Sequence, residues 1–248
     1  MTHATLFIPC IVDGMYPEVG EAVVKLFQRL GITMDYPENQ TCCGQPPFNS
    51  GYRKEAAKAA KHYIETFEDS ETIVCPSGSC VAMVRHHYRE LFENESTWQQ
   101  RAIAVGKRTF ELTEYLVDVL KIQNTGAWYD GTITYHDACH LKRYLGVAAQ
   151  PRALIRQVKG ATFVEMKDSD TCCGFGGAFS TKYPDISTVM VKEKVKNILD
   201  SGADAVVGCD MGCLMNIKGY LTRHNLDVRG PSLPGGAAIE PQCHPGKG

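Results

Sequence analysis

The sequence has little excess charge of either sign and no long hydrophobic run. Its 248 residues include 26 Lys and Arg against 28 Asp and Glu, a net charge of −2. Nucleic-acid binders and polybasic membrane-surface proteins are strongly basic, so the composition argues against both. The longest apolar runs, such as residues 4–9, fall far short of the ~18 residues that a membrane span needs. The first residues show no basic segment followed by a long apolar one, so we expect a cytoplasmic protein without a secretory signal.

Cysteine is the residue type that stands out. The chain contains 11 cysteines in 248 residues, a cysteine content of about 4%, which is below the ~8–10% typical of disulfide scaffolds. In a reducing compartment, cysteines in such number serve metal or redox chemistry more often than crosslinking. An isolated cysteine is equally well explained as a small buried hydrophobic residue. The spacing of the cysteines therefore decides between these interpretations.

Ten of the cysteines form two series with the same order and spacing. The first series is Cys10, Cys42, Cys43, Cys75 and Cys80, and the second is Cys139, Cys172, Cys173, Cys209 and Cys213. Corresponding members are 129, 130, 130, 134 and 133 residues apart, and Thr-Cys-Cys-Gly occurs in both halves. Such internal similarity indicates a duplicated unit of about 110–130 residues. We expect the first repeat to span residues 1–125 and the second 126–228.

The segments between the cysteines predict an α/β fold with two duplicated βαβ-type units, each with a small, mostly parallel sheet. Short β-prone runs alternate with helical patterns such as residues 52–67 and 184–199, which is typical of parallel βαβ units. A helical stretch over residues 98–122 is expected to close the first repeat. Residues 229–248, rich in Gly and Pro, are expected to form a poorly ordered tail in which Cys243 and His244 have no metal role.

The cysteines fall just beyond the expected strand ends, where open α/β sheets gather their ligands. The loops should therefore bring four cysteines of each repeat together. Soft thiolates select zinc, copper(I) or iron–sulfur clusters. Neighbouring residues in extended backbone point in opposite directions, so an adjacent Cys-Cys pair is hard to aim at one small ion. Gly44 and Gly174 follow the two pairs and allow close approach of a bulky inorganic core. This pattern favours an iron–sulfur cluster over zinc at one or both sites, and over purely structural thiols.

The doubled Cys-Cys-Gly motif resembles the CCG (cysteine-rich) domain family, from about residue 4 to residue 228. That family includes the cysteine-rich subunit of heterodisulfide reductases and the iron–sulfur subunits of glycolate and anaerobic glycerol-3-phosphate oxidases. The stand-alone, two-repeat arrangement looks closest to the lactate utilization protein A type. Three stretches carry this closer match: residues 42–52, 76–80 and 170–177.

The resemblance implies a cytoplasmic iron–sulfur electron-transfer subunit of a complex that oxidises L-lactate to pyruvate. A ferredoxin-like iron–sulfur subunit and a further small subunit would be its partners. It implies up to two [4Fe-4S] clusters, cubane or noncubane, with zinc as an alternative at one site. The implied ligands are Cys10, Cys42, Cys43 and Cys80 for one cluster, and Cys139, Cys172, Cys173 and Cys213 for the other. A heterodisulfide-type thiol–disulfide reductase subunit and a zinc-stabilised scaffold subunit remain alternatives.

Two further cysteines, Cys75 and Cys209, are possible fifth ligands. In heterodisulfide-type relatives the fifth cysteine belongs to a CxxC pair, whereas here four residues separate Cys75 from Cys80 and three separate Cys209 from Cys213. The 134-residue offset of Cys75 and Cys209 is one residue out of register with the 133-residue offset of Cys80 and Cys213. A slip of one residue after a strand can turn a side chain to the opposite face. At most one of the two should therefore lie where a fifth ligand belongs. We expect Cys75→Ser and Cys209→Ser each to keep most of the bound iron.

The histidines and glycines near the cysteines have plainer expected roles. His136, Asp137 and His140 surround Cys139 and are expected to form hydrogen bonds around a cluster and tune its potential, rather than to catalyse lactate oxidation. The Gly-Phe-Gly-Gly segment after Cys173 lacks a complete GxGxxG, so we expect a loop packed against a cluster and no dinucleotide site. His86 and His87 are expected on a helix surface.

Overall fold

The computed structural model describes residues 2–226 and 228–232, and it contains two four-stranded sheets. The first has the order β2-β1-β3-β4, with β1 at His3–Leu6, β2 at Thr33–Asp35, β3 at Ile73–Cys75 and β4 at Thr109–Glu111. The second has the order β6-β5-β7-β8, with β5 at Trp128–His136, β6 at Lys159–Phe163, β7 at Ala205–Gly208 and β8 at Arg229–Ser232. Every pairing in both sheets is parallel. The predicted fold class, α/β with two duplicated units, is confirmed.

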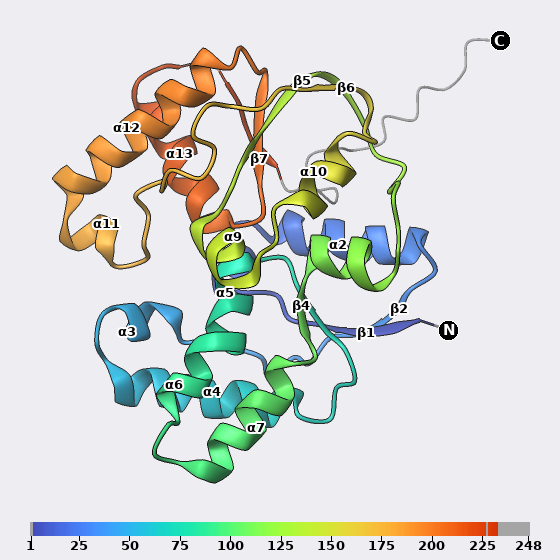
Figure 1. The fold of residues 1–248 in the computed structure, drawn as a ribbon, viewed down its shortest axis with the longest axis vertical. Coiled ribbons are helices and arrows are strands. Elements are labelled where there is room, and N and C mark those ends of the chain that lie inside the picture. Colours follow the sequence, from blue (N-terminus) through green and yellow to red (C-terminus); the bar gives the residue numbers. More distant parts are fainter. Residues whose placement is uncertain (1, 227, 233–248) are drawn as a thin grey trace.

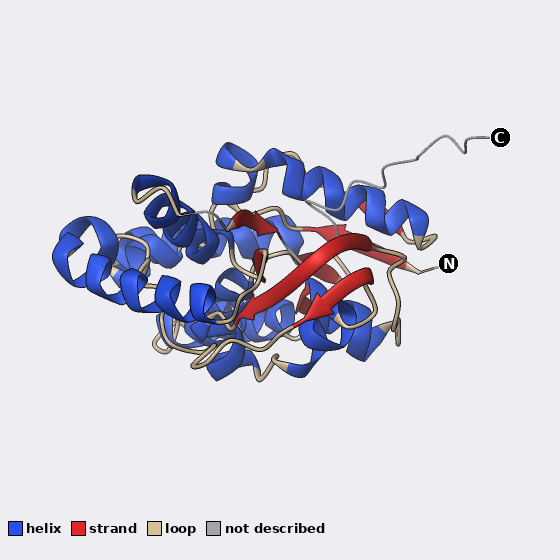
Figure 2. Cartoon of the chain, turned by 90° about the horizontal axis from the view of Figure 1, so that it is seen from above, coloured by secondary structure: helices blue, strands red, loops and turns tan. Residues whose placement is uncertain are grey.

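Helices flank the strands (Figure 2). The inner strands β3 and β7 are buried throughout, whereas the edge strands β2 and β6 are partly exposed. The helical segments of the first half are α1 (Cys10–Met15), α2 (Pro17–Arg29), α3 (Gln45–Asn49), α4 (Arg53–Phe67), α5 (Gly78–Ala82), η1 (Met83–His87), α6 (Tyr88–Leu91), α7 (Ser96–Gly106), α8 (Leu112–Glu114) and η2 (Tyr115–Val119). Those of the second half are α9 (Cys139–Leu145), α10 (Ala149–Ile155), α11 (Phe179–Lys182), α12 (Pro184–Asp200) and α13 (Met211–Arg223). In the described part of the chain, no helix is both long enough and apolar enough to cross a membrane.

Helix α2 shows how the sequence produces these elements. Pro17 begins the helix, where its missing N–H would have no partner in any case. Val19, Val23 and Phe27 recur at helical spacing and are buried. Gly31, at a φ of +68°, ends it in the left-handed conformation that glycine adopts readily. The chain then turns directly into β2.

Two segments differ from the expectation drawn from the sequence. The stretch 98–122 is not one helix, because β4 lies within it and pairs with β3, Ile73 opposite Thr109. A three-residue strand is too short to show a period, and the open edge of β3 decides its conformation. Arg229–Ser232 forms β8 against β7, where an irregular tail is expected. The rest of that tail, with Cys243 and His244, lies outside the described residues.

The two halves meet at α5 and α9, at the centre of Figure 1. The helices cross closely because Gly78 has no side chain: a Cβ there would lie 2.7 Å from the Cβ of Leu141. The Gly78 amide also donates to the carbonyl of Cys209 at 3.0 Å. From α13, Met211 and Leu214 pack into the hydrophobic cluster of the first half. This junction places the cysteine-bearing loops of both halves next to one another.

Candidate metal centres

Eight cysteines line one cavity of about 280 Å³ at the junction of the two halves. The first half contributes Cys10, Cys42, Cys43 and Cys80, and the second contributes Cys139, Cys172, Cys173 and Cys213. We call these groups the first set and the second set. Each is the group of four that the loop positions predict would come together. Apolar side chains, including Ile11, Val12 and Met211, complete much of the wall.

The first set comes from three segments of the first half. Cys10 begins α1, Cys42 and Cys43 precede α3, and Cys80 lies in the first turn of α5. The Cys43 thiol donates to the Cys80 sulfur at 3.3 Å. A hydrogen bond with the Cys10 thiol is the main reason that the pKa of Cys42 is lowered to about 3, and a hydrogen bond with the Cys43 thiol contributes further. Hydrogen bonds from neighbouring thiols also hold the pKa of Cys80 well below its usual range. The same hydrogen bonds raise the pKa of their donors, Cys10 and Cys43. Cys42 and Cys80 are therefore the two thiols of this set that most readily become thiolates, the form in which cysteine binds metals.

The second set repeats this arrangement. Cys139 begins α9, Cys172 and Cys173 follow β6, and Cys213 lies in the first turn of α13. A hydrogen bond from the Cys139 thiol is the main cause that lowers the pKa of Cys172 to about 2. The Gly174 amide donates to the Cys172 sulfur at 3.4 Å, as the Gly44 amide does to Cys42 at 3.4 Å. The two repeats thus share one way of presenting sulfur to the cavity.

The glycine after each Cys-Cys pair has no room for a side chain. Gly44 and Gly174 have φ values of +82° and +81°, which strain any residue with a Cβ. A Cβ on Gly174 would lie 2.7 Å from the carbonyl oxygen of Ser187, whereas one on Gly44 would lie 3.2 Å from that of Ala56. The backbone of each loop therefore packs directly on a long helix, α4 in the first half and α12 in the second.

We expect Gly174→Ala to destabilise the protein more than Gly44→Ala. Both substitutions place a Cβ at nearly the same positive φ, at a cost of about 1–3 kcal/mol. Only the first also forces a Cβ to 2.7 Å from a backbone oxygen. Urea unfolding of the two variants measures the difference. Equal loss of unfolding free energy in both would contradict this account of the loop.

The two possible fifth ligands lie in different surroundings. Ser77 precedes α5 and Asp210 precedes α13, so these two residues are equivalent in the two repeats. In this alignment Cys75 corresponds to Gly208, and Cys209 corresponds to Pro76. Cys75 is fully buried. Burial raises its pKa, and a hydrogen bond with the Cys80 sulfur raises it further. Cys209 instead lies against Tyr135, whose hydroxyl donates to its sulfur at 3.4 Å. Cys75 thus adjoins the first set, whereas Cys209 lies next to Tyr135, Thr113 and Glu111.

His136 lies closer to the second set than the sequence suggested. It is the last residue of β5 and is 1% exposed. One nitrogen of its ring and the sulfurs of Cys173 and Cys213 all lie within 4.8 Å of one another. Burial, with the nearby charge of Lys194, lowers the pKa of His136 to about 3. The imidazole is therefore neutral at physiological pH, which is the form that binds metals.

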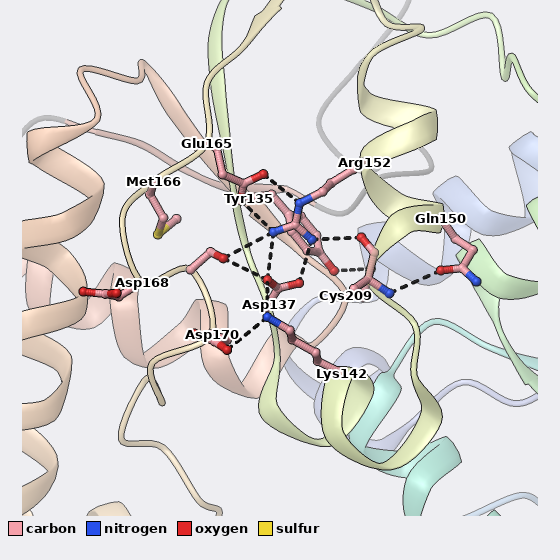
Figure 3. Close-up of polar contacts among 12 residues, drawn as sticks. Tyr135, Asp137, Lys142, Gln150, Arg152, Glu165, Met166, Asp168, Asp170 and Cys209 are labelled. Carbon is pink, nitrogen blue, oxygen red and sulfur yellow. Dashed lines mark hydrogen bonds and ion pairs between the residues drawn. The ribbon is translucent and has the colours of Figure 1, made fainter.

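Asp137 is part of a buried ion-pair network that holds the loop before Cys172 (Figure 3). Arg152 donates to both carboxylate oxygens at 2.8 Å, and the Ser169 hydroxyl donates at 2.9 Å. Arg152 also binds Glu165 at 2.6 Å. Burial alone would raise the pKa of Asp137, but the bonds from Arg152 and Ser169 hold it below its ordinary value. Asp137 thus positions the backbone around the second set, and its carboxylate is fully engaged.

His140 lies at the cavity and packs with residues of both halves. Its Nδ1 is 3.5 Å from the Cys139 sulfur, and its ring stacks on Tyr144. His87 packs edge-on against Tyr144 with centroids 5.0 Å apart, so its ring is largely covered, and only His86 is exposed as expected. These rings join the two halves beside the second set.

Asp210 is a cavity residue that sequence reasoning missed. It is buried directly before α13, and its carboxylate accepts a hydrogen bond from the Ser79 amide of the other half at 2.9 Å. Burial raises its pKa to about 6, against the opposing effect of the Ser79 bond. The sequence places this aspartate directly before Met-Gly-Cys, a position from which one predicts a helix N-cap. Nothing in that position predicts a hydrogen-bond partner in the other repeat.

The donor set fits a soft metal centre. Each set offers four sulfur donors on a largely apolar wall, two of them buried. Beside the second set lies an imidazole with no hydrogen-bond partner among the described residues. Thiolate-rich sites bind zinc or iron–sulfur clusters, and hard cations such as magnesium prefer oxygen ligands. The residues present could therefore hold one soft metal centre in each half.

Comparisons with known proteins agree with this arrangement. The cysteine-rich CCG domain matches residues 4–85 and 133–218, one match in each half. The chain is 48% identical over 231 residues to lactate utilization protein A of Exiguobacterium sp. strain AT1b, covering 92% of this chain and 94% of the relative. It is 48% identical over 225 residues to lactate utilization protein A 1 of Bacillus mycoides, covering 90% and 91%.

Among solved structures, glutamate racemase of Francisella tularensis superposes with a TM-score of 0.36 at 14% identity, covering 94% of this chain and 78% of that one. This likeness is too low to support any argument about fold or function. The sequence matches are extensive and span both repeats. The chain therefore belongs to the CCG cysteine-rich domain family and, within it, to the lactate utilization protein A family.

Proposed function

We propose that this chain is a cytoplasmic iron–sulfur electron-transfer subunit of a complex that oxidises L-lactate to pyruvate. The observation that carries the proposal is the cavity lined by two sets of four cysteines, at equivalent places in two repeats. The relatives named above are lactate utilization proteins, which supports the substrate. Ten described cysteines are free, in keeping with a reducing compartment.

The residues of the chain would hold, position and insulate two such centres. The first and second sets supply the thiolates, and a bound iron–sulfur cluster would accept and release single electrons. Gly44 and Gly174 bring backbone N–H groups to the sulfurs of Cys42 and Cys172, and such hydrogen bonds tune a redox potential. Ile11, Val12 and Met211 keep part of the wall apolar, which limits access of water.

We assign the oxidation of lactate itself to a partner. Removing two electrons and two protons from lactate requires a two-electron acceptor, and the Gly-rich loop after Cys173 lacks the full dinucleotide fingerprint. A ferredoxin-like iron–sulfur subunit and a further small subunit are the proposed partners. This chain would pass electrons between the oxidising subunit and the final acceptor.

The isolated chain should therefore show no lactate-dependent dye reduction. Activity should appear only when the co-purified subunits are present, and a dye-coupled assay of the chain and of the complex measures this. As a control, dithionite should reduce the centres of the isolated chain. Sustained turnover of lactate by this chain alone would contradict the division of labour.

One observation favours a second candidate function, thiol–disulfide reduction of the heterodisulfide type. Cys10 is exposed and lines the cavity, so a disulfide substrate could reach the first set. A disulfide that acts there should change the electron paramagnetic resonance (EPR) signal of the bound cluster when it is added. An unchanged signal favours electron transfer.

A further inference from the structure

His136 is a buried imidazole with unsatisfied nitrogens. It is 1% exposed, and neither ring nitrogen has a hydrogen-bond partner within the described part of the chain. Buried polar groups in folded proteins almost always have a partner, and each exception needs an explanation. The ring lies beside the carbonyl of Ser169, but that oxygen already accepts from the Asp137 amide at 3.0 Å and the Lys194 ammonium at 3.0 Å.

The surroundings of the ring supply the explanation. One ring nitrogen and the sulfurs of Cys173 and Cys213 lie within 4.8 Å of one another, and all three residues are buried. Nitrogen and sulfur donors at such separations can bind a single metal ion.

The first repeat shows what the equivalent position looks like without a donor. The 129-residue offset of Cys10 and Cys139 aligns His136 with Phe7. Phe7 packs edge-on against Tyr63, with centroids 4.9 Å apart, and belongs to an apolar cluster. The extra donor of the first repeat is instead Cys75, which adjoins Cys80. Each repeat thus has one additional donor beside its fourth cysteine, a thiol in the first and an imidazole in the second.

We propose that His136 is a ligand of the metal centre in the second repeat, taking the place that Cys75 has in the first. The inference rests on the proposed function insofar as it requires a metal centre bound by the second set. A neutral imidazole in place of a thiolate removes one negative charge and raises the reduction potential, as histidine ligation does in Rieske centres.

A buried cation next to the second set acts in the same direction. Lys194 is 0% exposed, and its ammonium donates to the carbonyls of Asp168 at 2.8 Å and Ser169 at 3.0 Å. The 130-residue offset of the Cys-Cys pairs aligns it with Ile64, a core residue of the first repeat. The second centre should therefore be reduced at a higher potential than the first.

Pulsed EPR of the reduced, anaerobically purified chain tests the ligand directly. We expect a strongly coupled nitrogen that changes on isotopic nitrogen labelling of histidine. The coupling should disappear in His136→Phe, which copies Phe7, and in His136→Cys, which should keep the metal through sulfur and lower the potential of the second centre. It should persist in His140→Gln, the control for the other histidine at this set. Loss of the coupling in His140→Gln, or its survival in His136→Cys, would overturn the proposal.

Metal content separates the possible failures. Iron without any coupled histidine nitrogen would overturn the His136 inference and leave the proposed function standing. Zinc in place of iron would contradict the proposed function, and X-ray absorption at the zinc edge would then show whether His136 contributes a nitrogen ligand. A chain without metal at the second set would contradict both.

Discussion

Replacing Cys213 by serine should remove the metal centre of the second repeat, so that iron and sulfide per chain fall by about half. Cys213 lies buried in the first turn of α13 and contacts the thiol of Cys173. A serine hydroxyl stays protonated near neutral pH and is a harder, poorer ligand for iron. Cys80→Ser should have the same effect on the first repeat. Iron and sulfide analysis of anaerobically purified variants measures the loss.

Cys209→Ser is the matched control for this prediction. Cys209 stands four residues before Cys213 and is also buried, but its sulfur accepts a hydrogen bond from the hydroxyl of Tyr135. We expect this variant to keep nearly all of its iron. If Cys209→Ser empties its site as completely as Cys213→Ser, five-cysteine ligation of the second centre is the better description.

Arg152→Ala should lower the free energy of unfolding by about 3 kcal/mol. It removes the main partner of a buried carboxylate and leaves it only the Ser169 hydroxyl and the ammonium of Lys142, which is 3.6 Å away. Arg152 donates to both oxygens of Asp137 at 2.8 Å, and Asp137 is 1% exposed. Urea unfolding at neutral pH measures the loss. The exposed pair of Lys25 and Glu21 offers a control, since Lys25→Ala should change stability little. Similar effects of the two variants would contradict the assigned role of Arg152.

The same ion pair predicts a dependence on pH. Because the pKa of Asp137 is lower in the folded protein than its ordinary value, the ionised carboxylate stabilises the fold. This contribution is complete above the ordinary pKa of an aspartate and is lost as the pH falls through the lowered, folded value. In Arg152→Ala this contribution should be smaller, because only Ser169 and Lys142 still favour the ionised carboxylate. The variant should therefore lose less stability than the wild type on acidification.

The duplicated fold was predictable because its signals are local and occur twice. The offsets of Cys10, Cys42 and Cys43 to their counterparts reveal the repeat, and alternating short strands and helices indicate parallel sheets. The strand β4 was missed because three residues carry no readable period, and its pairing with β3 is a tertiary effect.

Contacts between the halves could not be predicted from local patterns. That both cysteine sets line one cavity depends on how α5 crosses α9, which the close approach at Gly78 allows. The bond from the Ser79 amide to Asp210 joins residues 131 positions apart. His136 likewise reaches Cys213 only through the folded sheet, and its counterpart Phe7 gives no hint of a donor.

Each repeat, as we propose, holds an iron–sulfur cluster. Analysis of iron, zinc and acid-labile sulfide in the chain purified without oxygen tests it most directly. We expect about four iron and about four sulfide ions for each of two clusters, with little zinc. Zinc bound in their place, without iron or sulfide, would contradict the claim and leave a zinc-stabilised scaffold as the better interpretation.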